Sequence, residues 1–309
     1  MEPIFYPVNI AMSSFSRRHL LSTASLLTAT AFVACPVWAA AHSSQGKAQA
    51  QEQMAQLEQQ HKGRIGAALM NLSTGAVISH RGDERFLFNS TAKCFIAAAV
   101  LARVDSGDEK PDRCIIVSSA DLGGWTPVTE KHLGQPGMTV AALCQAAVVW
   151  SDNAAANVLI ASLGGPAKVT EYLRSIGDEV TRLDRMEPAL NEHDHAGDER
   201  DTTTPLAMLT TLQTLLLGEA LSPRSRHQLA AWMIEGKTGD NRLRAGMPPT
   251  WLVGEKTGTN GVGNTNDIGI AWPGDRGAVI AVAYTYLPQA TENQQDQVIA
   301  EIGRIASRV

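Results

Sequence analysis

Cysteine is scarce in this sequence, with four residues in 309, which is too few for a disulfide scaffold or a multi-cysteine zinc module. No apolar run reaches the roughly 18 to 20 residues that a membrane helix needs. The formal net charge of -5 provides no basic excess, which argues against a nucleic-acid partner. Because 44% of the residues are hydrophobic and 18% are charged, the composition predicts a compact, acidic, soluble protein.

The first 41 residues have the pattern of an export signal. Arg17 and Arg18 precede a mildly apolar stretch from Leu20 to Val33, and three alanines, residues 39–41, follow. A charged region, a short apolar region and an A-x-A type cleavage site are the three parts of such a signal. The arginine pair resembles a twin-arginine signal. We therefore predict cleavage after Ala41 and a periplasmic mature chain without an integral membrane segment, the alternative being an uncleaved basic N-terminus.

Strand patterns lie near both ends of the mature chain, and helical patterns lie between them. The expected strands span residues 64–70, 76–79, 250–255, 268–272 and 278–284. The helical runs span residues 94–104, 140–149, 154–163 and 206–217, with further helices at 42–60 and near the C-terminus. This order predicts an α/β fold in which both chain ends build one antiparallel sheet, flanked by helices, and in which an all-helical domain is inserted.

The expected boundaries assign residues 42–85 and 236–309 to the α/β domain and residues 86–235 to the helical domain. Within the helical domain, residues 183–204 have neither helical nor strand periodicity. A loop of that length inside a compact domain is usually functional or disordered, so this segment is a candidate part of the site.

The first candidate motif is Ser90-Thr91-Ala92-Lys93, which opens an apolar helical run. Ser90 is expected at the helix N-terminus, and Lys93 projects from the same face three residues later. The helix end favours developing negative charge, and an amine nearby can accept a hydroxyl proton, so the pattern suits a nucleophile. The alternative interpretation of Ser90 is a plain helix cap.

Two further motifs follow along the chain. The tripeptide Ser151-Asp152-Asn153 lies between two helical runs, and Lys256-Thr257-Gly258 leaves an expected strand, where the lysine can point into a cleft. A second Lys-Thr-Gly, residues 237–239, reads as a turn with no strand before it. We therefore prefer Lys256 to Lys237 as a site residue.

These three motifs, in this order and with Arg185–Asn191 between the second and third, resemble the class A serine β-lactamases. The resemblance covers essentially the whole mature chain. It implies the two-domain fold of β-lactamases and penicillin-binding proteins, and hydrolysis of the β-lactam ring of penicillins and cephalosporins, which confers antibiotic resistance. It implies no cofactor and no metal, and His193 and His195 in the loop lack a third placed ligand.

By this resemblance, Ser90 attacks the lactam carbonyl and forms an acyl-enzyme. Backbone amides of Ser90 and Thr259 form the oxyanion hole. Ser151 passes a proton to the departing ring nitrogen, with Lys93 and Lys256 as proton partner and electrostatic support. Each of these roles is an expectation carried over from the family.

Release of the acyl group is expected from Glu187 and Asn191, which hold and deprotonate a water molecule. The base for acylation stays open between Lys93 and Glu187. The residues expected to bind substrate are those that can contact its carboxylate, its side-chain amide or its open face: Trp125, Asn153, Arg242, Lys256, Thr257, Gly258 and Thr259.

The resemblance also carries expectations for the loop. Arg185 and Asp201 match an ion pair that ties its neck, and Pro188 matches the position after a cis peptide bond in the family. Asn157 matches an asparagine that braces the region of Glu187. Each has a plainer alternative, a surface ion pair or an ordinary turn proline.

Some positions depart from the family pattern. Cys144 matches one half of a common disulfide, but its partner position holds Ala97, so we predict free thiols at Cys94, Cys114 and Cys144. Asn89 and Asn260 stand where carbapenem-hydrolysing members have a cysteine pair, which lowers the expectation of carbapenem turnover.

Two rival functions share part of this pattern. A penicillin-binding transpeptidase or carboxypeptidase shares Ser90, Lys93 and Lys256 but stalls as the acyl-enzyme. A non-catalytic β-lactam sensor is usually fused to a membrane segment, and none is visible in the sequence. Glu187 and Asn191 favour the hydrolase, and a monomer is the default because nothing marks an oligomer interface.

Overall fold

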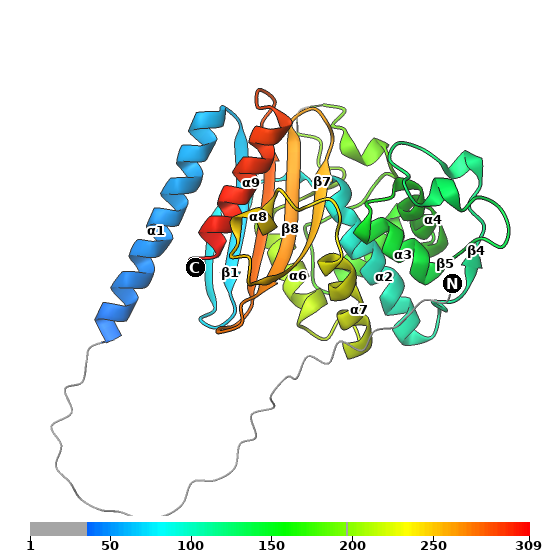
Figure 1. The fold of residues 1–309 in the computed structure, drawn as a ribbon, viewed down its shortest axis with the longest axis horizontal. Coiled ribbons are helices and arrows are strands. Elements are labelled where there is room, and N and C mark those ends of the chain that lie inside the picture. Colours follow the sequence, from blue (N-terminus) through cyan, green and yellow to red (C-terminus); the bar gives the residue numbers. More distant parts are fainter. Residues whose placement is uncertain (1–35, 196) are drawn as a thin grey trace, which may run out of the picture.

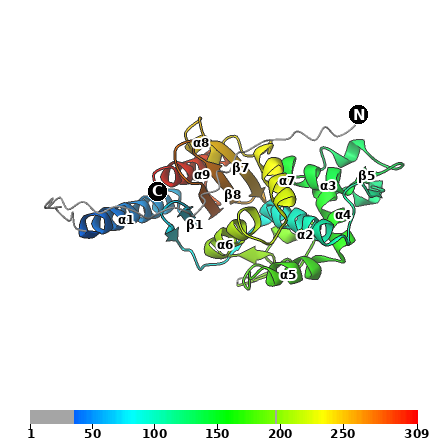
Figure 2. The ribbon, with the colours of Figure 1, turned by 90° about the horizontal axis from the view of Figure 1, so that it is seen from below.

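The structure, a computed structural model, describes residues 36–195 and 197–309, with side chains from residue 46 onward. Figure 1 shows a sheet with helices on both faces beside a larger helical part, and Figure 2 shows the same division from below. The expected α/β class and the antiparallel sheet from both chain ends are confirmed.

The sheet has five antiparallel strands in the order β2-β1-β9-β8-β7. Its strands are β1 (Arg64–Asn71), β2 (Ala76–His80), β7 (Leu252–Thr259), β8 (Asn264–Trp272) and β9 (Val279–Tyr286). Ladder pairing of β1 with β9 joins the N-terminal hairpin to the C-terminal strands. Two small sheets pair β3 (Phe86–Leu87) with β6 (Thr202–Thr203) and β4 (Cys114–Ile115) with β5 (Met138–Thr139).

Successive residues of β9 face opposite layers, because the side chains of a strand alternate between its faces. Val279, Ala281 and Ala283 belong to the core on the outer face of the sheet. Ile280 and Val282 belong to the larger core that the sheet shares with the helical part. Both faces are therefore covered, as the near-continuous apolar run of this strand suggests.

The outer face is covered by α1 (Pro36–His61) and α9 (Glu292–Ala306), with the short α8 (Leu243–Gly246) beside α9 (Figure 1). Thr291 caps α9 in a capping box with Gln294. Buried Val298, Ile302 and Ile305 lie one helical turn apart on the face toward the sheet, as the sequence predicts.

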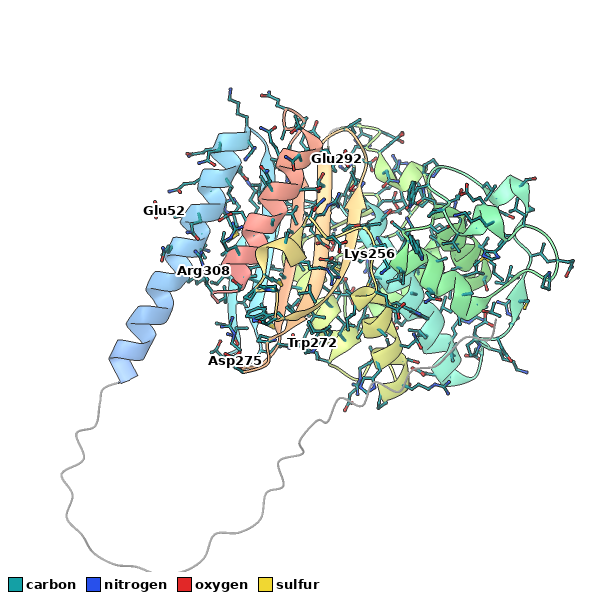
Figure 3. All side chains as sticks on the ribbon, in the orientation of Figure 1. Glu52, Lys256, Trp272, Asp275, Glu292 and Arg308 are labelled. Atoms are coloured by element: carbon teal, nitrogen blue, oxygen red, sulfur yellow. The ribbon has the colours of Figure 1, made fainter. Side chains whose placement is uncertain are left out.

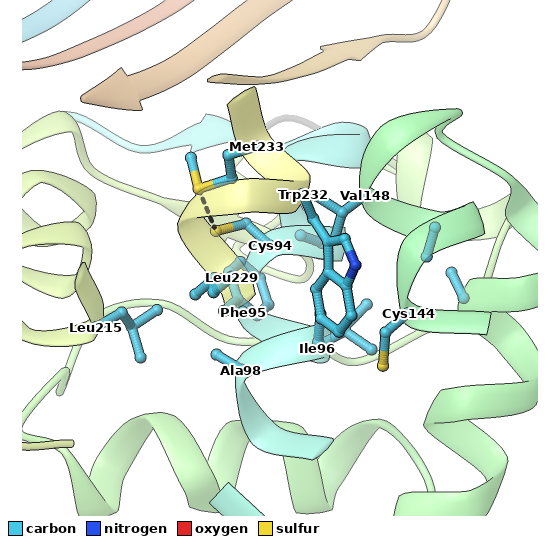
Figure 4. Close-up of a cluster of buried hydrophobic side chains, with 14 of the residues drawn as sticks. Cys94, Phe95, Ile96, Ala98, Cys144, Val148, Leu215, Leu229, Trp232 and Met233 are labelled. Atoms are coloured by element: carbon cyan, nitrogen blue, oxygen red, sulfur yellow. Dashed lines mark hydrogen bonds between the residues drawn. The ribbon is translucent and has the colours of Figure 1, made fainter. Parts of the chain in front are cut away.

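The helical part contains six α-helices among the described residues: α2 (Ala92–Ser106), α3 (Val140–Val149), α4 (Asn153–Leu163), α5 (Pro166–Ser175), α6 (Pro205–Leu216) and α7 (Pro223–Ile234). The central helix is α2, which contacts α3, α4, α5 and α7. Figure 4 shows Cys94 and Ile96 of α2 packed near Trp232 and Met233 of α7. This packed helix supports the turn of Ser90.

Two strand predictions are wrong at their ends. The strand expected at 250–255 continues to Thr259, so Lys256-Thr257-Gly258 lies within β7 and does not leave it. The strand expected at 268–272 begins at Asn264, because four polar residues, 264–267, are buried in the ladder. Apolar periodicity cannot detect strand residues that are polar and buried.

Other expectations need smaller changes. The N-terminal helix expected at 42–60 begins at Pro36, and the loop of residues 183–204 includes the short 3-10 helix η4 (Ala189–Asn191) and β6. The expected leader, with Arg17 and Arg18, lies outside the described residues. Among the helices that are described, none is long and apolar enough to cross a bilayer. The domain boundaries at 85/86 and 235/236 stay predictions.

Candidate functional site

A cleft of about 500 Å³ lies where β7 meets the helical part. Its lining residues come from seven separate segments: Ser90, Trp125, Ser151, Asn153, Glu187, Asn191, Thr238, Arg242, Thr257, Gly258, Thr259 and Glu292. Lys93 and Lys256 are 1% exposed and reach these residues from below. Figure 3 shows Lys256 at the side of the sheet that faces the helical part. The structure thus brings together all twelve residues expected from the sequence.

Ser90 lies in the 3-10 helix η1 (Asn89–Thr91), immediately before α2. Its Oγ is 2.6 Å from Lys93 Nζ, which confirms the expected approach of the amine one turn later. Gly258 allows β7 to approach this turn, since a Cβ there would lie 2.8 Å from Phe88 O and 3.1 Å from Ser90 N. The strand backbone and the turn of Ser90 therefore form one wall and the floor of the cleft.

Glu187 points inward from the loop of residues 183–204. Its Oε1 accepts hydrogen bonds from Ser90 Oγ at 3.1 Å and from Lys93 Nζ at 2.5 Å. Its Oε2 accepts from Asn191 Nδ2 at 2.6 Å. Asn157 braces the same residue from α4, donating to Glu187 O and accepting from Glu187 N, both at 2.9 Å. The carboxylate is therefore fixed beside the Ser90 hydroxyl.

Lys93 and Glu187 form a buried ion pair. Burial alone raises the pKa of Glu187, but the Lys93 charge and the hydrogen bonds from Lys93, Asn191 and Ser90 outweigh it and hold this pKa below its usual value. Burial lowers the pKa of Lys93, and the Glu187 carboxylate opposes that decrease. Glu187 is thus ionised near neutral pH and can accept a proton.

Ser151 and Lys256 form the opposite wall. Lys256 Nζ donates to Ser151 Oγ at 3.1 Å and to Thr257 O at 2.8 Å. Burial, assisted by the nearby positive charge of Lys93, lowers the pKa of Lys256 to about 7. Ser151 has a left-handed backbone (φ 59°), a strained conformation that is often found at functional sites.

Arg242 precedes α8 and reaches the end of β7. Its guanidinium donates to Thr259 Oγ1 at 2.8 Å, to Gly258 O at 3.1 Å and to Asn266 O at 3.0 Å, while its Nε pairs with Asp296 at 2.7 Å. The positive charge is therefore fixed beside the hydroxyl of Thr259.

The open side of the cleft carries Trp125 and Asn153. Trp125 is 60% exposed, and its indole donates to Trp150 O at 2.8 Å, which fixes the ring at the rim. Asn153 Oδ1 accepts from Lys93 Nζ at 2.8 Å, so the oxygen end of the amide faces the lysine.

The neck of the loop is tied as expected. Arg185 Nε contacts Asp201 Oδ2 at 2.6 Å, and the Asp201 side chain is fully buried. The peptide bond between Glu187 and Pro188 is cis, as the resemblance implies. The ion pair holds the segment that carries the carboxylate.

Two lining residues were not expected from the sequence. Thr238 belongs to the second Lys-Thr-Gly, which does form a turn, yet its Oγ1 lies 2.6 Å from Thr257 Oγ1. Glu292 lines the cleft from the first turn of α9. Neither has a local sequence signal, because distant chain segments bring each to the cleft.

The cysteine prediction is confirmed for the described residues, in which Cys94, Cys114 and Cys144 are all unpaired. No group of three or more His, Cys, Asp or Glu residues in residues 36–195 and 197–309 is placed to hold a metal ion.

Sequence comparisons identify similar proteins over most of the chain. A model of the β-lactamase enzyme family matches residues 49–309. The β-lactamase OXY-2 of Klebsiella oxytoca is 45% identical over 256 residues, which are 83% of this chain and 88% of that protein. The β-lactamase L2 of Stenotrophomonas maltophilia is 46% identical over 256 residues, covering 82% and 84%.

Solved structures give the same result. An ancestral class A β-lactamase (GNCA) is 56% identical, with a TM-score of 0.81 over 84% of this chain and 99% of that one. The putative class A β-lactamase PenP of Rhodopseudomonas palustris is 47% identical, with a TM-score of 0.81 over 84% and 98%.

Proposed function

This chain belongs to the class A β-lactamases, serine hydrolases that open the β-lactam ring and confer antibiotic resistance, and we propose that it acts on penicillins and cephalosporins through an acyl-enzyme on Ser90. One observation carries the proposal: the Glu187 carboxylate contacts Ser90 Oγ with one oxygen and Asn191 with the other. A carboxylate in that place can activate water against an ester on Ser90.

In acylation, Ser90 Oγ bonds to the lactam carbonyl carbon and its proton passes to Lys93 or Glu187, both of which are within hydrogen-bond distance. The carbon–nitrogen bond of the ring then breaks. The nitrogen takes a proton from Ser151, which regains one from Lys256, the lysine that donates to it. The proton that leaves Ser90 replaces the one that Lys256 gives up, so the protons balance and Glu187 is ionised again before deacylation.

In deacylation, Ser90 Oγ carries the acyl group and no longer has a hydrogen to donate. Glu187 Oε1 loses that donor and can accept one from water instead. Water adds to the ester carbonyl carbon as Glu187 takes its proton, the bond from this carbon to Ser90 Oγ breaks, and Ser90 takes a proton back. The products are the ring-opened acid and free enzyme.

Substrate binding is proposed for the polar groups around the cleft. Lys256 and Arg242 supply positive charge, and Thr257 and Thr259 supply hydroxyl groups, for the carboxylate of the β-lactam. Gly258 keeps the strand close to Ser90. The amide oxygen of Asn153 accepts from Lys93, so its amide nitrogen can donate to the side chain of the substrate. The exposed ring of Trp125 forms a wall at the rim.

The rival transpeptidase function is disfavoured by the same carboxylate. Such an enzyme needs Ser90, Lys93 and Lys256, but it has no use for a buried base that contacts the nucleophile. Class A β-lactamases are generally exported. For this chain we propose export by the twin-arginine signal at Arg17 and Arg18. We further propose that the mature protein is a monomer in the periplasm.

The decisive experiment compares wild type with Glu187→Gln on nitrocefin and penicillin. We expect steady hydrolysis by wild type. For Glu187→Gln we expect a stoichiometric burst and a covalent adduct on Ser90 by mass spectrometry, since an amide cannot take the proton of water. Equal turnover by both proteins would remove Glu187 from the proposed role.

A further inference from the structure

Three asparagine side chains form a hydrogen-bonded row that leads from the sheet to Glu187. Asn266 of β8 donates to Asn89 Oδ1 at 2.7 Å, and Asn89 Nδ2 donates to Asn191 Oδ1 at 2.9 Å. Asn191 Nδ2 then donates to Glu187 Oε2 at 2.6 Å. Asn266 and Asn89 are fully buried, and neither lines the cleft.

The orientation of the first amide, that of Asn266, is set by two backbone groups, one on β3 and one on β9. Asn266 Nδ2 donates to Leu87 O at 2.9 Å, and Asn266 Oδ1 accepts from Thr285 N at 3.1 Å. A carbonyl oxygen only accepts and a backbone N–H only donates. The Asn266 amide therefore has one satisfied orientation, because the reverse orientation would leave a donor facing a donor and an acceptor facing an acceptor.

That orientation passes along the row. Because the Asn266 nitrogen donates to Asn89, the Asn89 oxygen must be the acceptor. The Asn89 nitrogen then faces Asn191. The Asn191 oxygen must in turn accept from the Asn89 nitrogen, so the Asn191 nitrogen faces the Glu187 carboxylate. A reversed Asn191 amide would place an oxygen against the carboxylate, which repels it. The backbone groups Leu87 O and Thr285 N thus favour the end of the Asn191 amide that faces Glu187, and Pro188 O, which accepts from the same Asn191 Nδ2 at 3.0 Å, favours the same end.

The conformation of Asn89 supports a specific role. Its backbone is left-handed (φ 50°), a region that asparagine tolerates better than most residues. Asn260, at the other position where some relatives have cysteine, donates to Asn191 O at 3.2 Å. Both asparagines therefore contact Asn191, but Asn89 contacts its side chain whereas Asn260 contacts its backbone oxygen.

We propose that Asn89 and Asn266 are positioning residues for deacylation, which orient the Asn191 amide so that Glu187 and its water are held for attack on the acyl-enzyme. The proposal rests on the proposed function, in which Glu187 is the deacylation base. It predicts that loss of the row slows release of the acyl group and leaves its formation unchanged.

Two substitutions test it. Asn89→Asp keeps the shape and can still accept from Asn266, but a carboxylate cannot donate to Asn191. Asn89→Gly removes the amide without adding charge and suits the left-handed backbone, so this variant is expected to fold. For both we expect deacylation to slow by about 10- to 100-fold, the scale of a lost hydrogen bond to a charged network.

The readout is the pattern of steady-state constants for nitrocefin, with the acyl-enzyme followed by mass spectrometry after rapid quenching. When deacylation alone slows, kcat and KM fall together and kcat/KM stays at the wild-type value. A general loss of structure would lower kcat/KM instead. The matched control is Asn260→Asp, which adds the same charge and also removes a donor to Asn191, but at the Asn191 backbone oxygen and not at its side chain, so kcat is expected to stay close to wild type.

The possible results separate the two proposals. If Glu187→Gln traps the acyl group while folded Asn89→Gly and Asn89→Asp release it at the wild-type rate, the role of the row is refuted. If Glu187→Gln itself releases the acyl group like wild type, the proposed function fails first. Trapping by Glu187→Gln together with slow release by both Asn89 variants supports the proposal.

Discussion

The ion pair between Arg185 and Asp201, at the neck of the 183–204 loop, tests how much burial increases the contribution of an ion pair to the free energy of unfolding. The Asp201 carboxylate accepts from Arg185 Nε at 2.6 Å, from Arg185 N at 3.0 Å and from Asp184 N at 2.8 Å. Asp201→Asn removes the charge and keeps the shape. Asparagine also tolerates the left-handed backbone at this position (φ 57°), so the substitution adds no backbone strain.

Removing one partner of a buried ion pair costs about 3–5 kcal/mol. Arg185 is partly exposed and keeps two further acceptors, Glu192 O and Asp194, so we expect the lower limit, about 3 kcal/mol. For a domain of this size, each kcal/mol lowers Tm by about 2–4 °C, which gives a decrease of about 6–12 °C.

The matched control is Asp194→Asn, because Asp194 pairs with the same arginine at 3.3 Å and with Arg200 at 2.5 Å, but its side chain is 56% exposed. Each exposed pair contributes about 0–1 kcal/mol, so the loss of two pairs should lower Tm by at most about 8 °C, and by less than Asp201→Asn lowers it. Thermal unfolding of the three proteins, followed by circular dichroism at one pH and salt concentration, makes the comparison. Equal shifts for the two variants would refute the argument from burial.

Further predictions concern ionisation and thiol access. The pKa of Lys256, lowered by burial to about 7, makes it cationic below that pH and neutral above it. The value of kcat/KM should therefore fall above about pH 7, Lys256→Arg should flatten this limb, and a wild-type profile that stays level to about pH 9 would contradict the assignment. Burial raises the pKa of Cys94 to about 12 and also raises that of Cys144, whereas Cys114 is exposed. In a thiol titration with a chromogenic disulfide, Cys114 alone should react in the native mature protein, with the other two reacting after unfolding in guanidinium; three reactive thiols in the native protein would contradict the buried positions.

Local patterns were sufficient for much of the fold and for the identity of the site. The spacing of Ser90 and Lys93 indicates one helix face, and the structure places the two side chains in contact. The apolar run of β9 and the helical spacing of α9 likewise predict their elements, because the period of a pattern follows from backbone geometry. The expected cleft residues were identified through four motifs and their order, and not through any one motif alone.

Contacts between distant segments could be decided only by the tertiary structure. Lys256 meets Ser151 across 105 positions, and Asn266 meets Asn89 across 177. Thr238 reaches the cleft from a turn that the motif analysis set aside in favour of Lys256. A hydrogen bond between side chains so far apart has no local period or composition to reveal it. The sequence determined which chemical groups the protein has, whereas the packing of the helical part against β7 determined which of them can exchange a proton, because that requires separations of about 3 Å.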